Sequence, residues 1–208
     1  MMINHGSLAI EYGNLQFQID PVSSYGGKDV DYTIFPDADY ILVTHEHGDH
    51  LCSETIDMIR GPKTRIFINE AGQEKLGAGE VMKNGESIEL QEGITLTAVP
   101  AYNISEGHTQ FHPKGNGNGY ILSIDGLRIY ISGDSENISE MSGLGKIDIA
   151  FLAANQPYTM TEEQCIEAAL RIHPEYLIPY HLSDTDAWKI KDALQEHEIK
   201  VLLYEELK

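Results

Sequence analysis

The chain has 208 residues, of which 41% are hydrophobic and 23% charged, a composition typical of one soluble globular domain rather than of a disordered chain. Fourteen Lys and Arg residues stand against 33 Asp and Glu residues, and the formal net charge of -19 excludes extended binding to a nucleic-acid backbone. No apolar run reaches the length of a membrane span and the first residues lack the features of a signal peptide, so residues 1–208 are expected to form a single cytoplasmic domain without membrane contact.

Short runs rich in β-branched and aromatic residues recur along the chain, mostly bounded by Gly, Asn, Asp or Pro, and each run predicts a strand. These predicted strands span residues 8–12, 15–19, 40–44, 65–68, 87–90, 95–100, 119–124, 127–132, 147–152, 176–179 and 200–203. Helices are predicted over residues 52–60, 70–76, 161–171 and 186–198. Asp125-Gly126 suits a tight hairpin turn, and Thr161 with Gln164 forms a capping-box pattern. Many strands with few helices predict two packed sheets flanked by helices.

A dense group of potential metal ligands follows the buried strand that is predicted over residues 40–44. His45, His47, Asp49 and His50 lie within six residues directly after this strand. Imidazole and carboxylate groups are suitable donors for zinc and related divalent ions, and the absence of nearby thiolates argues against a closed structural zinc site. In an extended turn the first two histidines can project to one side while the other two side chains reach a neighbouring position. One loop therefore serves two metal ions, which need further ligands from distant strand ends, including a carboxylate that bridges them.

Two later strands end in residues that can supply those further ligands. Asp134 follows Gly133 at the end of the strand over residues 127–132, and His181 follows the strand over residues 176–179. Each residue alone is as consistent with an ordinary loop as with a ligand. Together with the first group they repeat one arrangement, a buried strand that ends in a ligand, three times along the chain.

The ordered set His45-x-His47-x-Asp49-His50, a downstream histidine, Gly133-Asp134 and His181 resembles the metallo-β-lactamase superfamily over almost the whole chain. Further motifs are similar to a branch of compact metal-dependent hydrolases that includes relatives of ascorbate-6-phosphate lactonase. They are Asp20-Pro21, Val99-Pro100-Ala101-Tyr102-Asn103, Phe111-His112-Pro113-Lys114-Gly115 and Tyr158-Thr159-Met160-Thr161. The resemblance implies an α/β protein with a four-layer αββα sandwich.

The resemblance also implies a ligand set, which we carry over residue by residue. It implies His45, His47 and one middle histidine at the first metal, Asp49, His50 and His181 at the second metal, and Asp134 as the bridge. The middle histidine is either His108 or His112, which lie four residues apart. We favour His112 because residues 111–115 resemble a recurrent motif of the branch, in which case His108 lines the substrate cleft.

These residues predict a hydrolase that holds two divalent metal ions, zinc first, with manganese or iron as alternatives. Metal-bound hydroxide is expected to cleave a small-molecule ester, lactone-like or phosphoester substrate, with Asp49 as the catalytic residue that orients the nucleophile or relays its proton. The alternatives are a phosphodiesterase and a non-catalytic metal-binding or regulatory protein on the same fold.

The remaining candidate residues are Asp20 and three histidines outside the predicted ligand set. Asp20 either positions a metal ligand from behind or simply ends a strand, two interpretations of equal weight. His5, His173 and His197 belong to no pattern and are expected to be surface or packing residues. Relatives suggest that assembly into a homo-oligomer is possible.

Overall fold

The computed structural model describes residues 1–204 and contains two large sheets, a two-stranded ribbon and helices. The strands are β1 (Met2–Asn4), β2 (Ser7–Tyr12), β3 (Leu15–Ile19), β4 (Ser24–Tyr25), β5 (Lys28–Asp29), β6 (Ala38–Leu42), β7 (Arg60–Ile68), β8 (Glu80–Val81), β9 (Ser87–Gln91), β10 (Ile94–Ala101), β11 (Gly117–Ile124), β12 (Leu127–Ile131), β13 (Ile149–Ala153), β14 (Tyr176–Tyr180) and β15 (Lys200–Val201). The α-helices are α1 (Ser53–Ile59), α2 (Glu70–Leu76), α3 (Glu162–Ile172) and α4 (Ala187–Ala193), and short 3-10 helices span Tyr32–Ile34 and Ser139–Gly143.

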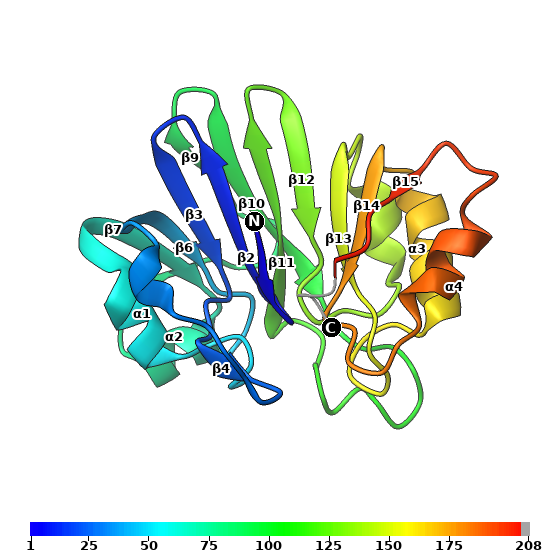
Figure 1. The fold of residues 1–208 in the computed structure, drawn as a ribbon, viewed down its shortest axis with the longest axis horizontal. Coiled ribbons are helices and arrows are strands. Elements are labelled where there is room, and N and C mark those ends of the chain that lie inside the picture. Colours follow the sequence, from blue (N-terminus) through cyan, green and yellow to red (C-terminus); the bar gives the residue numbers. More distant parts are fainter. Residues whose placement is uncertain (205–208) are drawn as a thin grey trace.

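The two large sheets form the centre of a four-layer arrangement. The first sheet has the strand order β1-β2-β3-β6-β7-β8, and the second has the order β15-β14-β13-β12-β11-β10-β9. Helices α1 and α2 lie on the outer side of the first sheet, and α3 and α4 lie on the outer side of the second (Figure 1). The predicted αββα sandwich is therefore confirmed.

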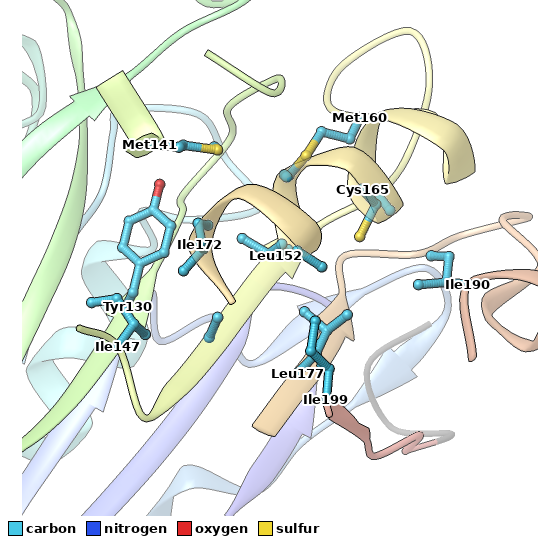
Figure 2. Close-up of a cluster of buried hydrophobic side chains, with 14 of the residues drawn as sticks. Tyr130, Met141, Ile147, Leu152, Met160, Cys165, Ile172, Leu177, Ile190 and Ile199 are labelled. Carbon is cyan, nitrogen blue, oxygen red and sulfur yellow. The ribbon is translucent and has the colours of Figure 1, made fainter. Parts of the chain in front are cut away.

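Alternation along the strands explains why each sheet is buried on both faces. In β12, Ile129 and Ile131 belong to the apolar cluster between the sheets, whereas Tyr130 between them belongs to the cluster beneath the helices of the second sheet. In β6, Leu42 packs between the sheets and Ile41 packs on the side of α1. Successive side chains of a strand point to opposite faces, so two apolar layers require near-continuous apolar runs. Figure 2 shows the outer cluster over the second sheet, where Leu152 and Leu177 meet residues of the covering helices.

Local sequence signals set several element ends. Asp125 and Gly126 both have positive φ, 46° and 90°, in the hairpin between β11 and β12, as the Asp-Gly pair predicts. Thr161 caps α3 in the predicted capping box with Gln164. The predicted helix over residues 186–198 was too long. Helix α4 ends at Ala193, and the residues from Gln195 to Glu198 are exposed and offer no apolar face to the core.

Within residues 1–204, no helix combines the length and apolar character needed to cross a membrane.

Strand direction brings distant parts of the chain to one edge of the sandwich. In the first sheet β1, β3 and β6 run in the same direction, and in the second β10, β12 and β14 do. Asp20 follows β3, the loop with His45 to His50 follows β6, Asp134 follows β12 and His181 follows β14. Carboxyl ends of parallel strands meet at one edge, which is where ligand sites form in sheets of this kind.

Candidate metal centre

Every predicted metal ligand lies in one of three groups of residues at this edge. Within each group, the candidate ligand atoms are all within 4.8 Å of one another. The groups are His45, His47 and His112; His45, His50 and Asp134; and His5, Asp49 and His181. The structure thus brings together the residues that the sequence analysis selected, and it adds His5. No residue within 1–204 supplies a thiolate to these groups.

Asp134 lies at the centre of the site and faces both predicted metal positions. Its Oδ2 atom is 3.3 Å from Nε2 of His112 and 3.9 Å from Nε2 of His45, which belong to the first position. The same oxygen is 3.5 Å from Nε2 of His181, and Oδ1 is 3.3 Å from Nε2 of His50, at the second position. Oδ2 thus lies between imidazoles of both positions and Oδ1 faces His50 at the second, so the carboxylate as a whole faces both sets of imidazoles, as a bridging ligand requires.

Asp20 and Thr44 fix the orientation of two histidines from behind. Asp20 is fully buried, and it accepts hydrogen bonds from the backbone N–H of Thr44, from its hydroxyl and from Nδ1 of His50, each at 2.7 Å. Because the Thr44 proton goes to Asp20, its Oγ1 is left to accept from Nδ1 of His45 at 3.0 Å. Both imidazoles therefore have Nδ1 occupied from behind and turn Nε2 toward the centre of the site.

The loop after β6 is held across the sandwich by the second sheet. The Tyr120 hydroxyl donates a 2.9 Å hydrogen bond to the carbonyl of Val43, and the Asn118 backbone N–H donates one of the same length to the carbonyl of Thr44. These bonds place the residue before His45 relative to β11. The ligand loop is consequently fixed by both sheets and not by its own strand alone.

His112, and not His108, enters the cluster. Nδ1 of His112 donates to Oδ1 of Asn103 at 2.7 Å, and its Nε2 lies 3.2 Å from Nδ1 of His47, so these two nitrogens face the same point. His108 instead directs Nδ1 toward Glu136 at 3.6 Å. Glu136 also accepts from the backbone N–H groups of Ile104 and Ser105, at 2.8 and 2.7 Å, and so organises the loop that carries both histidines.

Burial and neighbouring groups shift the protonation of the site residues. Although burial opposes protonation, the carboxylates of Asp134 and Asp20 hold the pKa of His50 well above its usual value, so a metal ion must displace a proton there. Burial lowers the pKa of His45 well below its usual value and also lowers that of His112, so both remain neutral imidazoles. Burial opposes ionisation of Asp49, but its hydrogen bond with His181 and the nearby imidazoles hold the pKa of its carboxyl well below the usual range. His45 and His112 thus present lone pairs on nitrogen, and Asp49 presents a charged oxygen.

Several buried polar atoms of the cluster have no hydrogen-bond partner. They are Nε2 of His45, Nε2 of His50, Oδ1 of Asp134, Nδ1 of His181 and both ring nitrogens of His5. Buried polar groups in folded proteins are almost always paired, so a concentration of unpaired imidazole and carboxylate atoms in one place is the arrangement that a cation site would offer to an ion. Nitrogen and oxygen donors of this kind, oriented from behind, fit a divalent metal ion.

Gly133 allows Asp134 to reach the site. Its φ is +57°, and an added Cβ would lie 2.7 Å from the Asn118 carbonyl oxygen and 3.1 Å from Cβ of Thr44. The position therefore demands both the left-handed backbone and the absence of a side chain. Asp20 and His181, at the ends of β3 and β14, also have positive φ, 45° and 56°. Such backbone strain at strand ends is typical of functional sites.

Gly133→Ala is expected to lower the free energy of unfolding by about 3 kcal/mol, because strain at positive φ adds to overpacking against the Asn118 carbonyl. Gly13 is the matched control, since its φ is +60° and no atom lies within 4 Å of an added Cβ. Gly13→Ala is expected to cost only about 1 kcal/mol. Urea denaturation of both metal-free variants measures the difference, and equal losses would contradict the close approach at Gly133.

A cavity of about 660 Å³ opens over the metal-ligand cluster. Its walls combine ligands with apolar and charged side chains, namely Tyr25, Glu46, His47, Gly48, Asp49, Lys75, Phe111, His112, Asp134, Tyr158 and His181. A volume of this size suits a small molecule. His108, which was expected to line the cleft, is not among the residues that line the cavity. Tyr25 and Lys75 were not predicted, because nothing in their local pattern distinguishes them from surface residues. His5 was likewise expected to be a surface or packing residue.

Comparison with known proteins agrees with the fold and with a metal-dependent hydrolase. Residues 1–181 match the model of a beta-lactamase superfamily domain. A UPF0173 metal-dependent hydrolase from Methanopyrus kandleri is 30% identical over 188 residues, which cover 86% of this chain and 81% of the relative. The crystal structure of a protein from Parabacteroides distasonis, described as a metal-dependent hydrolase, is 50% identical and has a TM-score of 0.94, with 98% of this chain and 91% of that chain covered.

A more distant structure shows how far the fold extends. The metallo hydrolase Igni18 from Ignicoccus hospitalis is 23% identical, with a TM-score of 0.83 over 100% of this chain and 95% of that chain. At this identity the likeness concerns the fold alone. The family match over residues 1–181 and the closer relatives lead to one conclusion. The chain belongs to the beta-lactamase superfamily and, within it, to the UPF0173 metal-dependent hydrolases.

Proposed function

We propose that the protein holds two divalent metal ions and hydrolyses a small-molecule ester, a lactone-like compound or a phosphoester. One observation carries the proposal: the two carboxylate oxygens of Asp134 face Nε2 atoms of two ligand groups, those of His50 and His112. The first position would be held by His45, His47 and His112, and the second by Asp49, His50 and His181. Zinc is the first choice for these ions, and manganese and iron are the alternatives.

Bound divalent ions would lower the pKa of a water molecule toward neutrality and polarise a carbonyl or phosphoryl oxygen. The protein's own residues prepare the site for that chemistry. Asp20, Thr44 and Asn103 occupy the Nδ1 atoms of His50, His45 and His112, so that the Nε2 atoms of these three histidines are aimed inward. This preorganisation avoids rearrangement of the ligands during the reaction.

Asp49 is the residue best placed to handle a proton. Its side chain lines the cavity and is 23% exposed, while its Oδ2 atom lies 3.3 Å from Nε2 of His181. The carboxylate is ionised, because its neighbours hold its pKa low. It can therefore accept a hydrogen bond from a water molecule in the cavity and orient that water; because a carboxyl with a low pKa holds a proton weakly, Asp49 would relay the proton rather than keep it.

The cavity walls suggest a substrate with an apolar part and an anionic group. Phe111 and Tyr158 meet edge to face with ring centroids 5.0 Å apart, and both border the cavity. Lys75 is the one Lys or Arg among the described residues that line it, and its Nζ donates to the carbonyl of Glu46 at 2.5 Å. In a chain with a net charge of -19, a lysine at this mouth favours an anionic substrate. This observation favours a phosphodiesterase as the second candidate.

The proposal is tested by metal analysis of the purified protein and by a panel of lactone, phosphodiester, phosphomonoester and β-lactam substrates. We expect about two ions per chain and metal-dependent turnover of one substrate class. Asp49→Ala is expected to lower kcat/KM by at least about a hundredfold, because the proton acceptor is lost. His45→Ala serves as the variant with an impaired first metal position.

Two outcomes would count against this proposal. If Asp49→Ala keeps both its metal content and its activity, Asp49 has no catalytic role. If the protein binds two ions but turns over no member of the panel, the non-catalytic metal-binding alternative gains support. Turnover of the phosphodiester alone would establish the second candidate.

A further inference from the structure

His5 lies beside the second ligand group, although it is far from the other members in sequence. It occupies the turn between β1 and β2, where its φ is 47° and its side chain is 1% exposed. Neither ring nitrogen has a hydrogen-bond partner. A buried imidazole without any partner is unusual, because burial removes the water that would otherwise satisfy it.

The ring of His5 faces the carboxylate of Asp49. Nε2 of His5 is 3.7 Å from Oδ2 of Asp49, and the same oxygen is 3.3 Å from Nε2 of His181. Neighbouring ligands of one tetrahedral ion with bonds of about 2.0 Å are separated by roughly 3.3 Å, and wider angles give larger separations. The spacing of these three side chains is thus compatible with a shared ion.

Contacts on both faces hold the His5 ring in this orientation. The ring of Tyr25 stacks on it at a centroid distance of 4.0 Å with an interplanar angle of 25°, and the ring of His181 lies 3.7 Å away at 41°. The carbonyl of His5 accepts a hydrogen bond from the backbone N–H of His181 at 3.3 Å. The side chain therefore has a defined place in the cluster.

The turn around His5 is shaped to approach the other ligands. Gly6 lies against His50, and a Cβ at Gly6 would come within 3.0 Å of its Cε1 atom. Ser7 donates a 2.6 Å hydrogen bond from its hydroxyl to the carbonyl of Asp20. The turn is thereby tied to the residue that orients His50, and any larger residue at Gly6 would push the turn away from the site.

We propose that His5 is a ligand of the second metal position, which it shares with Asp49 and His181 through Nε2. The inference rests on the proposed two-metal function and adds a residue to it. With His5 included, the side chains facing this position exceed the four ligands of a tetrahedral zinc site, so an ion that accepts more ligands, such as manganese or iron, fits it well.

The experiment compares ligation with simple stacking by using two substitutions. His5→Phe keeps an aromatic ring between Tyr25 and His181 but has no nitrogen, whereas His5→Gly tolerates the positive φ and leaves room for added imidazole. Metal-free protein is titrated with Co²⁺, and the dissociation constants of both ions are followed by d–d absorption and chelator competition. His197→Phe is the matched control, because His197 is an exposed histidine outside the cluster.

We expect His5→Phe to weaken binding of the second ion by about 10- to 100-fold and to change its absorption spectrum, while the first ion and His197→Phe stay at the wild-type values. Imidazole is expected to restore the second ion in His5→Gly. Wild-type affinity and spectrum in His5→Phe would overturn the proposal and leave His5 as a stacking residue, with the two-metal function intact. A wild-type protein that takes up only one ion would overturn the two-metal function and this proposal with it.

Discussion

Replacing Asp134 by Asn is expected to lower kcat/KM by about a thousandfold, which corresponds to about 4 kcal/mol of lost transition-state stabilisation. The expected loss is large because Asp134 is the residue whose oxygens face both ligand groups, at 3.3 Å from His112 and 3.3 Å from His50. An amide has almost the same shape as the carboxylate, but it carries no charge and offers one acceptor oxygen instead of two. Asn at this position can serve one metal position or the other, not both.

Metal content and kinetics of Asp134→Asn decide this prediction together. We expect fewer than two ions per chain at equilibrium and a fall in kcat as well as in kcat/KM. Asp57→Asn is the matched control, because Asp57 is an exposed residue of α1 whose ion pair with Arg60 lies on the surface. Two tightly bound ions and wild-type turnover in Asp134→Asn would show that this carboxylate does not bridge the site.

Asp20→Asn is expected to weaken metal binding by about 10- to 100-fold, although Asp20 does not itself face the centre of the site. Asp20 accepts from Nδ1 of His50 and from both donors of Thr44. An Asn side chain cannot accept all three bonds. If its NH₂ group faces His50, the imidazole must carry its proton on Nε2, where the proton blocks coordination. The loss of a buried, charge-assisted hydrogen bond is also expected to lower the free energy of unfolding by about 2 kcal/mol.

Chelator competition for metal affinity and chemical denaturation for stability measure the two effects of Asp20→Asn. Asp39→Asn is the matched control, since Asp39 accepts a 2.9 Å hydrogen bond from the backbone N–H of Gln16 at the opposite end of β6. That variant is expected to lose some stability but no metal affinity. Unchanged metal affinity in Asp20→Asn would mean that the orientation of His50 does not depend on this carboxylate.

The residues that the structure brings together as predicted are those that follow the end of a buried strand. His45 to His50, Asp134 and His181 each come shortly after an apolar run, and strand direction brings those ends to one edge. Asp20 follows the same rule, and its contact with His50 matches one of the two interpretations that the sequence allowed. The αββα layers could also be predicted from the sequence, because apolar residues fill both faces of the central strands.

His112 and His5 could not be predicted from the ends of buried strands. His108 and His112 share one irregular loop, so their distance from a strand end does not distinguish them. The resemblance of residues 111–115 to a family motif favoured His112, and its contacts with Asn103 and His47 place it in the cluster. His5 follows β1, a strand of three residues that is too short to produce a visible pattern. An isolated histidine in such a turn carries no periodic signal. The sequence feature that points to it is the His5-Gly6 pair between two apolar segments, which becomes informative only when the strand order is known.

The division of the chain between the sheets has a practical consequence. All strands of the first sheet end by Val81, and all strands of the second begin at or after Ser87. A cut within residues 82–86 would therefore give two fragments that each carry one sheet. The first would carry His45, His47, Asp49 and His50, and the second His112, Asp134 and His181. Neither fragment would contain a complete set of metal ligands. Under the two-metal proposal, an added divalent ion would therefore stabilise the reassociated pair, and metal binding could be used to control assembly of the two fragments.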